Sequence, residues 1–428
     1  MTSEELKSIL QNRQSRSLRV ADSKTYKIGM NAGIFQASPK PAPDNRIPVP
    51  FIRRAIKLII GYFAKPGNIT YQGEWFAQFL KDIYDANDEE VETAAILEDA
   101  LTYGAAYELH WYNQETGFEF APIPVDQAYP IFSKSLKPKL TGFVWQRKTA
   151  DAEIATFYDD KEYQTFIKNG DDWRLDEENS GAHLYGKVPV LEAVIDRDKR
   201  NVFDPILPML DMYDKVISMV GNEHEKFAEA ILLLRDKIDN ITVDENGLTD
   251  ADKVAQWRIL DGLGDNVNTA AAYLTKNLND TFINNTLDRY ERLMYEMLCL
   301  FNPNDDSFAT GSGIAQAYKL FGFELFIANL QAYFLPFLYN RMRMIAGHAV
   351  INQEDEADSV TVKTTRNLPF NMTETAQVVA LLAGGKQILS QETLLNLFPR
   401  DIVEDVAEEI ERVKAETPTL SNPFQGLE

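Results

Sequence analysis

The side chains that could carry out catalysis or bind a metal are few in this chain and lie in unrelated segments. It contains four His and one Cys. His224-Glu225 resembles the start of an HExxH zinc-protease motif, but the position of the second His is occupied by Ala228. A Cys and His metal cluster cannot be built around one Cys. We therefore interpret His224 as a hydrogen-bonded residue between helices and Cys299 as a small apolar core residue.

Motifs that bind phosphate or activate a nucleophile are also incomplete. The GGK run at 384–386 lacks the spacing of a P-loop, and the GSG run at 311–313 lacks the spacing of a nucleophile elbow. Carboxylates cluster at 88–90, 354–356 and 405–411, in patterns typical of solvent-exposed loops and helix faces rather than of a two-metal site. The sequence predicts no catalytic residue, no metal and no cofactor, with a metal-dependent nuclease or phosphatase as an alternative.

The length and composition set further bounds. A chain of 428 residues is too long for one compact core, so we expect two or more domains. One Cys excludes a disulfide framework, and the N-terminal segment has no signal-peptide core, so a cytoplasmic protein is expected. The net charge of −22 argues against tight binding of nucleic acid, but not against a wall that surrounds DNA without gripping it.

The segment from Gly313 to about Met344 is the most informative element, because it has a helical period and is apolar on nearly every side. Its first stripe consists of Ile314, Tyr318, Phe321, Leu325, Ala328, Ala332, Leu335 and Tyr339. Its second stripe consists of Leu320, Phe323, Ile327, Leu330, Phe334 and Phe337. Polar residues inside the segment argue against a membrane span. We expect Pro336 to bend this buried helix, and neighbouring copies of the chain to supply part of its burial.

Two further helices show apolar residues at alternating spacings of four and three, which is typical of packed helix pairs. One begins at Asp204-Pro205 and extends to Leu234, and the other runs from Ile283 to Phe301. The intervening module is predicted to contain a strand at 238–243, a helix at 250–260 and a strand at 270–275.

The first 200 residues predict an α+β domain with a mainly antiparallel sheet. Helices are expected over Phe51–Phe63 and around Val91–Tyr107. Strand-like alternation occurs at 108–113, 118–125, 142–148, 154–159 and 163–168. After the long apolar helix we expect a strand at 359–365 and helices from Thr373 and Ser390 to about Glu416. The predicted fold class is therefore α+β.

The order of these elements resembles that of portal proteins of tailed double-stranded DNA phages, in the siphophage-type branch. The resemblance spans nearly the whole chain and depends on six landmarks taken together. They are NRIPVPFIRRAIKLIIGYFAKPG (45–67), ALTYGAAYELHWYNQETGFEFAPIPVDQAY (100–129), GKVP (186–189), DPILPMLDMYDKVISMVGNEHEKFAEAILLLRD (204–236), SGIAQAYKLFGFELF (312–326), and the pair NLPFN (367–371) and LSQETLLNLFP (389–399).

The resemblance implies a portal-type subunit that assembles with its copies as a ring, usually of twelve, at one capsid vertex. The parts would be an α+β wing (1–203) completed by a long kinked helix and wing strand (314–370), stem helices (204–236 and 277–301), a small αβ clip (237–276), a tunnel loop (302–313) and a helical crown (371–428).

The resemblance also implies roles for single residues. The tunnel loop would bring Asn304, Asp305, Asp306, Ser307 and Thr310 toward DNA. In the stem, Lys276, Arg289 and Arg292 would face the channel, with ion pairing to neighbouring acidic residues as the alternative. In the clip, Trp257 and Arg258 would contact a partner. Between copies, Phe321, Phe326 and Pro336 would pack.

The implied function is that of a structural, non-enzymatic portal that forms the channel for DNA packaging and ejection and docks the terminase motor. Expected partners are copies of the chain, the terminase large subunit, head–tail connector or adaptor proteins, capsid and scaffolding protein, and double-stranded DNA passing without sequence specificity. No membrane is expected. The expected location is the portal vertex of the virion, after assembly in the host cytoplasm. Another phage head structural or adaptor protein is the alternative within the same class.

Overall fold

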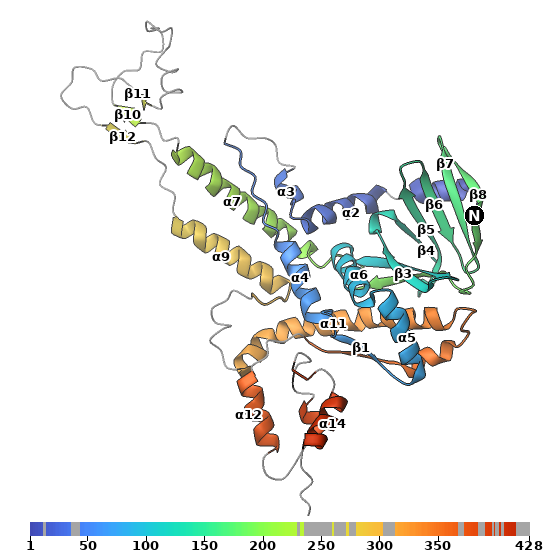
Figure 1. The fold of residues 1–428 in the computed structure, drawn as a ribbon. Coiled ribbons are helices and arrows are strands. Elements are labelled where there is room, and N and C mark those ends of the chain that lie inside the picture. Colours follow the sequence, from blue (N-terminus) through green and yellow to red (C-terminus); the bar gives the residue numbers. More distant parts are fainter. Residues whose placement is uncertain are drawn as a thin grey trace, which may run out of the picture. The chain divides into compact units, whose positions relative to one another are not determined.

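The computed structural model describes residues 1–11, 14–35, 43–228, 232–234, 259–260, 271–273, 280–302, 313–366, 372–383, 390–395, 398, 402–403 and 406–416 (Figure 1). The chain divides into two compact units, Met1–Thr365 and Arg366–Glu428, which are described separately. Helices and strands are mixed throughout the first unit, which confirms the predicted α+β class.

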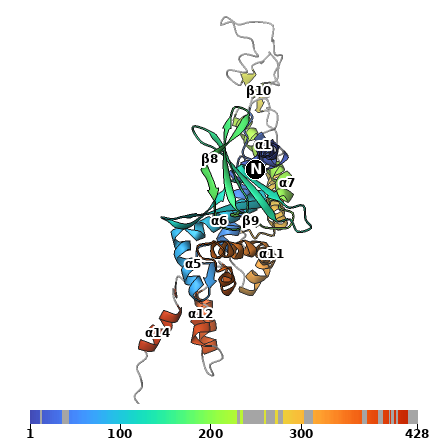
Figure 2. The same cartoon turned by 90° about the vertical axis from the view of Figure 1, so that its right-hand side faces the viewer.

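Two antiparallel sheets, one of five strands and one of three, form most of the β part of the first unit (Figure 2). The three-stranded sheet has the order β3-β2-β9 and consists of β2 (Ala105–Asn113), β3 (Gly117–Ile123) and β9 (Val190–Val194). The five-stranded sheet follows chain order and consists of β4 (Ala128–Phe132), β5 (Leu140–Lys148), β6 (Glu153–Tyr158), β7 (Glu162–Asn169) and β8 (Asp172–Ala182). All five predicted strand runs are confirmed. Gly117 and Gly170, at the turns between strands, have φ of +87° and +63°, a conformation that favours glycine.

Helices cover these sheets and supply the core. They are α1 (Ser3–Gln11), α2 (Gln14–Lys27), α3 (Ala32–Phe35), α4 (Phe51–Phe63), α5 (Trp75–Ala86) and α6 (Glu89–Tyr103), with the short η1 (Val125–Gln127). α4 has the predicted bounds. The predicted helix around Val91–Tyr107 is shorter than expected, because it ends at Gly104 (φ +85°), where a Cβ would lie 2.2 Å from the Lys199 carbonyl oxygen. Ala105–Tyr107 belong to β2 instead.

The long apolar helix is α11 (Gly313–Ala346), and it continues through Pro336. It packs against β9 and against η3 (Glu354–Ser359). The predicted strand after it is β13 (Thr361–Thr364), which pairs antiparallel with β1 (Ile69–Gln72). By length and composition alone α11 could cross a membrane, which is weak evidence because core helices pass the same test.

The two helices with alternating spacing are α7 (Leu207–Ala228), which follows η2 (Asp204–Ile206), and α9 (Asp280–Met297); they lie side by side (Figure 1). The first helix is shorter than predicted, because Leu232–Leu234 form strand β10. β10 pairs with β11 (Ile259–Leu260) and with β12 (Ala271–Tyr273). β11 lies at the end of the segment 250–260, which was predicted to be a helix. β12 lies within the strand predicted at 270–275. The predicted strand at 238–243 lies outside the described residues.

Three evenly spaced hydrogen bonds hold the segment 45–49 against α7. Backbone N–H groups donate from Asn45 to Asn222 Oδ1 (2.6 Å), from Ile47 to Ser218 Oγ (2.9 Å) and from Val49 to Asp214 Oδ1 (2.9 Å). Ile47 and Val49 each precede a Pro, which favours an extended backbone. Two extended residues span about 6.6 Å and four helical residues about 6 Å, so the spacings of donors and acceptors match.

The second unit contains α12 (Met372–Ala383), α13 (Gln391–Leu395) and α14 (Val406–Glu416). The helices expected from Thr373 and from Ser390 are thus found. Ser390 caps α13, because its Oγ accepts a hydrogen bond from the Thr393 N–H at 3.2 Å. Leu394 and Val403 are buried within this unit.

Candidate functional site

The two apolar stripes of α11 have opposite environments in the single chain. All six residues of the second stripe are buried, whereas Phe321 and Leu325 of the first stripe are 62% and 57% exposed. Ala328 and Ala332 are exposed as well. In the single chain a band of the first stripe therefore faces outward, and its burial by neighbouring copies of the chain stays a prediction. An exposed apolar band of this kind marks an interaction surface.

The predicted packing residues lie on or beside this band. Phe321 is exposed rather than part of the chain's own core. Phe326 is half-buried and its ring is stacked on that of Phe323, with centroids 6.5 Å apart. Pro336 is exposed. Whether another copy contacts these three residues remains a prediction.

A buried ionic network fixes the far end of α11 to the sheet and to α6. Arg341 is fully buried, and its Nε and Nη2 donate to Glu108 Oε1 and Oε2 at 2.9 and 2.5 Å. Its Nη1 donates to Glu89 Oε1 and to Thr93 Oγ1, both at 2.6 Å. The guanidinium carbon lies 4.8 Å from the centre of the Phe120 ring. Each of the three guanidinium nitrogens thus has a partner within the core.

Electrostatics keeps the network ionised. Burial alone would raise the pKa of Glu108, but the charge and hydrogen bonds of Arg341, together with nearby His110, lower it to about 2. Burial opposes the charged form of Arg341, yet Glu108 and Glu89 raise the pKa of Arg341 well above its usual value. A charged pair of this kind holds α11 in one position, so the outward direction of the first stripe is fixed.

The arrangement of α7 and α9 also leaves apolar side chains uncovered. Met212 and Met219 on α7 are 45% and 41% exposed, and Phe282 on α9 is 67% exposed. Met297, the last residue of α9, is 48% exposed. The side chains that α7 buries include Asp214, Ser218 and Asn222, which bind the segment 45–49.

Of the predicted channel residues, the structure describes two. Arg289 is exposed on α9, and Arg292 is exposed with its Nε 3.6 Å from Glu296 Oε1, one turn along the helix. The ion pair proposed as the alternative for Arg292 is therefore present. The other predicted contact residues, Lys276, Trp257, Arg258, Asn304, Asp305, Asp306, Ser307 and Thr310, lie outside the described residues.

The side chains with catalytic potential do not converge. His224 is exposed, so its assignment to a buried position between helices is wrong. Cys299 is exposed too, at φ +54° in the turn after α9, and is not a core residue. Within the described residues, no group of three or more His, Cys, Asp or Glu could hold a metal ion. Glu89, predicted to be a solvated acidic residue, is buried instead and bound to Arg341.

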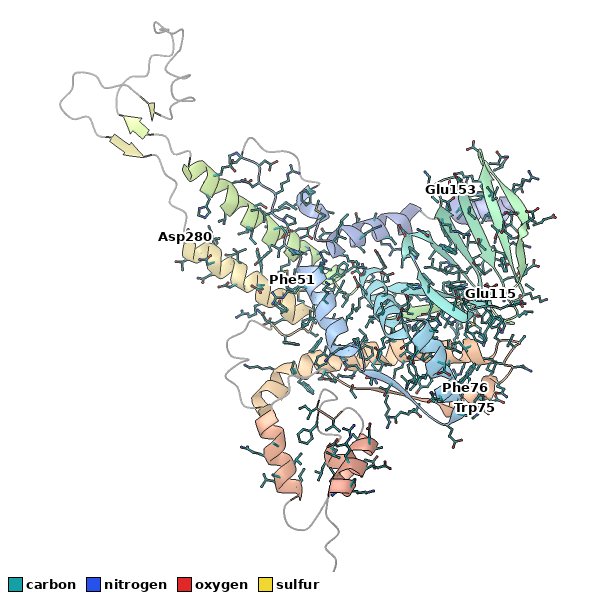
Figure 3. All side chains as sticks on the ribbon, viewed as in Figure 1. Phe51, Trp75, Phe76, Glu115, Glu153 and Asp280 are labelled. Atoms are coloured by element: carbon teal, nitrogen blue, oxygen red, sulfur yellow. The ribbon has the colours of Figure 1, made fainter. Side chains whose placement is uncertain are left out.

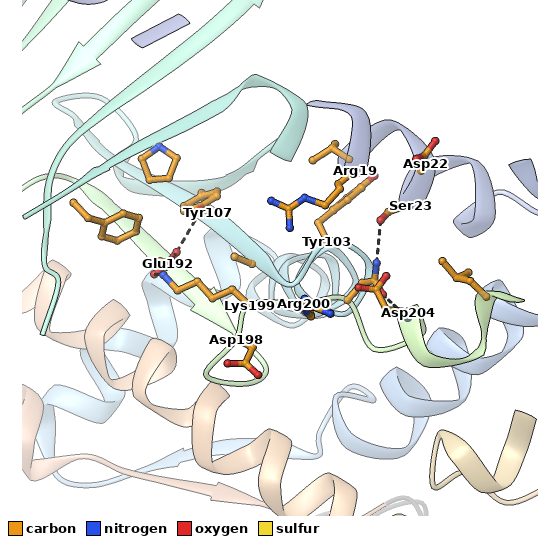
Figure 4. Close-up of a pocket in the computed structure, with 16 residues that line it drawn as sticks. Arg19, Asp22, Ser23, Tyr103, Tyr107, Glu192, Asp198, Lys199, Arg200 and Asp204 are labelled. Carbon is orange, nitrogen blue, oxygen red and sulfur yellow. Dashed lines mark hydrogen bonds and ion pairs between the residues drawn. The ribbon is translucent and has the colours of Figure 1, made fainter. Parts of the chain in front are cut away.

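The cavity in Figure 4 is bordered by α2, the start of β2 and the loop after β9. Two of its charged side chains are paired: Lys199 Nζ lies 2.7 Å from Glu192 Oε2, and Tyr107 donates a hydrogen bond to Glu192 at 3.2 Å. Asn201 Nδ2 donates to Ser23 Oγ at 3.1 Å. These bonds join α2 to the three-stranded sheet and indicate a structural role.

The sequence contained a signal for the buried network that pattern reasoning missed. Arg341 lies near the end of the apolar helix pattern, and Glu108 is an acidic residue in a strand that is buried from Ala105 to His110. One basic and one acidic residue, each beside apolar residues of a largely buried element, indicate a buried pair, because neither is buried alone.

Comparisons with known proteins bear on the whole chain. Residues 6–421 match the family described as phage portal protein, SPP1 Gp6-like. Among the similar chains of solved structures are two at 11% identity each. The first, from "Neck of empty GTA particle computed with C6 symmetry", has a TM-score of 0.48 and covers 88% of this chain and 93% of that chain. The second, from "Neck of native GTA particle computed with C12 symmetry", has a TM-score of 0.46 and covers 87% of this chain and 92% of that chain. No curated protein matches.

The family match covers all but the first five and the last seven residues, and it includes α11, its buried network and both helices of the predicted stem. The chain therefore belongs to the SPP1 Gp6-like family of phage portal proteins, and it is a structural portal, or connector, protein of the phage particle.

Proposed function

We propose that this protein forms a closed ring of identical subunits, expected to be twelve, through which phage DNA is packaged and ejected. The observation that carries the proposal is the exposed band of α11, defined here as Phe321, Leu325, Ala328 and Ala332. Burial of one large apolar side chain contributes about 1.5–3 kcal/mol. In a closed ring, each subunit contacts its neighbours through two different surfaces, so the same burial stabilises every interface.

The parts of the subunit follow the expected plan in this proposal. Residues 1–203 and 314–370 form the wing, and 204–236 and 277–301 form the stem that lines the channel. The clip, 237–276, docks the terminase motor and later the head–tail connectors, with Trp257 and Arg258 as contacts. Residues 302–313 form the tunnel loop. The crown, 371–428, faces the capsid interior.

The proposed role is mechanical and not enzymatic. The exposed apolar residues on α7 and α9, such as Phe282 and Met219, support it, because neighbouring stems would cover them. Packaging energy would come from the separate motor. The negative charge of the chain suits a channel wall that does not hold DNA, because a strongly basic wall would bind phosphate and slow its passage.

The experiment that tests this proposal is electron microscopy and mass photometry of the purified chain, with three variants. Wild type should form rings with a central opening wide enough for a duplex. Phe321→Asp and Leu325→Asp should fold, as judged by circular dichroism, and remain monomeric. Val350→Asp, at a side chain with the same 57% exposure as Leu325, should still form rings. A wild type that stays monomeric at all concentrations, or rings in all three variants, would contradict the proposal.

A further inference from the structure

We propose that the β4–β5 loop, residues 133–139, of one subunit docks into a pocket between α5 and the start of α6 of the next subunit. This inference rests on the proposed ring and identifies one contact within it. The loop is basic with an apolar tip, the pocket has a mainly acidic rim with an exposed apolar side chain, and the two lie at opposite ends of the same strand.

The loop has the composition of a ligand for an acidic surface. Lys134, Lys137 and Lys139 are exposed, and Leu136 at the tip is completely exposed. Among the described residues, the three Lys side chains form no ion pair, although the chain as a whole carries a net charge of −22. The positive charge of the loop is thus available to a partner.

Hydrogen bonds within the loop hold it in shape. The Ser133 N–H donates to the Lys139 carbonyl at 2.9 Å, and the Lys139 N–H donates to Ser133 Oγ at 3.0 Å. Ser135 Oγ donates to the Lys137 carbonyl at 2.7 Å. A preformed loop loses little conformational freedom when it docks, so its tip can act as a rigid anchor.

The pocket matches the loop in charge and in character. Its cavity, of about 570 Å³, is bordered by β1, α5 and the start of α6. Four acidic side chains at its rim are exposed: Glu74, Asp85, Asp88 and Glu90. One basic side chain, Lys81, is exposed among them, so the lining keeps an excess of negative charge. Val91, 64% exposed, contributes an apolar wall, and the neighbouring Trp75 is 50% exposed (Figure 3). Exposed apolar side chains surrounded by acidic groups fit a leucine flanked by lysines.

The two surfaces lie at opposite ends of β2. At one end, Asn113 pairs with Gly117, and Asn87 at the end of α5 donates to the Phe118 carbonyl at 2.8 Å. α6 runs back from this end toward Gly104, so its first residues lie beside α5.

At the other end of β2, Ala105 pairs with Val194, the last residue of β9. The loop that follows Val194 contains Lys199. Lys199 Nζ lies 4.4 Å from the centre of the Phe132 ring, and the β4–β5 loop begins at the next residue. A ring requires each subunit to present one surface to the neighbour on one side and a complementary surface to the other. The loop and the pocket satisfy this requirement, because the nine-residue strand β2 lies between them.

The test is site-specific crosslinking in the assembled ring. The exposed Cys299 is first replaced by Ser, and Leu136→Cys is combined with Val91→Cys. A short bismaleimide should then give a ladder of covalent oligomers on a denaturing gel. Each single-Cys variant should stay monomeric on the gel. The pair Leu136→Cys and Leu175→Cys, which places the second thiol on β8, is the matched control and should give no ladder.

A charge exchange tests the recognition itself. Lys134→Glu with Lys137→Glu should slow crosslinking at least tenfold, and adding Asp85→Lys with Glu90→Lys should restore the original rate. All rings are checked by electron microscopy before the crosslinker is added. Rings without a ladder, or a rate unaffected by charge reversal, would overturn the docking of this loop and leave the ring intact as a proposal. Absence of rings in every variant and in wild type would overturn the ring, and the loop contact with it.

Discussion

Arg341 and Glu108 form a bidentate ion pair in the core, with Nη2 2.5 Å from Oε2, although 233 residues separate them in the sequence. The pair joins the end of α11 to the middle of β2. Because a charge buried without a partner is far more costly than a paired one, the two elements are held in a single relative position. That position determines which stripe of α11 faces outward.

The loss of Arg341 should therefore be strongly destabilising. Arg341→Met leaves Glu108 buried without its main partner, and we expect the free energy of unfolding to fall by about 3–5 kcal/mol. The matched control is Arg343→Met, because Arg343 pairs with Asp358 at the surface, where a pair contributes about 0–1 kcal/mol. Urea unfolding followed by circular dichroism compares the two. Equal effects of both substitutions would contradict the importance of the buried pair.

The same pair predicts a specific loss of stability in acid. The pKa of Glu108 is lowered from 4.5 to about 2 on folding, so its ionised form contributes stability above about pH 4.5. That contribution, about 3 kcal/mol, is lost as the pH falls toward 2. Wild type should therefore lose more stability than Glu108→Gln between about pH 5 and about pH 3 in urea titrations. Parallel pH dependence of the two proteins would show that Glu108 is not the titrating group.

Ser218→Ala should loosen the segment 45–49 without unfolding α7. The substitution removes the acceptor of the Ile47 N–H, a hydrogen bond with a net contribution of about 1 kcal/mol. Hydrogen exchange of peptides that contain Ile47 should then be about fivefold faster. Met219→Ala changes an exposed neighbour on the same helix and should leave this rate unchanged. Unaltered exchange in Ser218→Ala would mean that other contacts hold the segment.

Ring stability should depend on salt, because every subunit carries a net charge of −22. Repulsion between like charges is screened at high ionic strength and extends about 30 Å at 0.01 M. We expect the fraction of rings in mass photometry to fall on dilution into low salt and to recover when salt is restored. A ring fraction that does not change with salt would contradict this account of assembly.

Removal of residues 304–309, which lie outside the described residues, should separate assembly from packaging. The apolar band of α11 remains in this variant, so rings should form as in wild type. DNA filling of particles should be impaired, because these residues are proposed to reach the DNA. Normal filling, measured as nuclease-protected DNA per particle, would remove the role assigned to the loop.

Periodic apolar patterns predicted most of the helices and strands, because the apolar residues that form such a pattern are the ones that the element buries against the core. α4 appears with the predicted bounds, and α11 and the five strand runs are where alternation placed them. The two stripes of α11 could be read from spacing, but not which of them the chain buries itself. That choice depends on Arg341 and its partners in α6 and β2, which are distant in sequence.

Polar residues were harder to place than apolar ones. Asp214, Ser218 and Asn222 lie at spacings of four on α7 and are buried, which is a detectable signal, but their partner segment is about 170 residues away. Cys299 belongs to an apolar run, yet a left-handed turn exposes it. The contact residues proposed for the tunnel loop and clip depend on the assembled ring and its partners, which one chain does not specify.

The match between two residues of the segment 45–49 and four residues of α7 restricts how this region can change. In an extended chain, backbone N–H groups point to alternate sides. A shift of the segment by one residue would therefore turn the three donating N–H groups away from α7, and all three hydrogen bonds would be lost together. The next position that restores the pairing lies a full helical turn away. Insertions and deletions should therefore be tolerated before Asp44 but not between Asn45 and Val49, where the contact of this segment with α7 allows a single geometry.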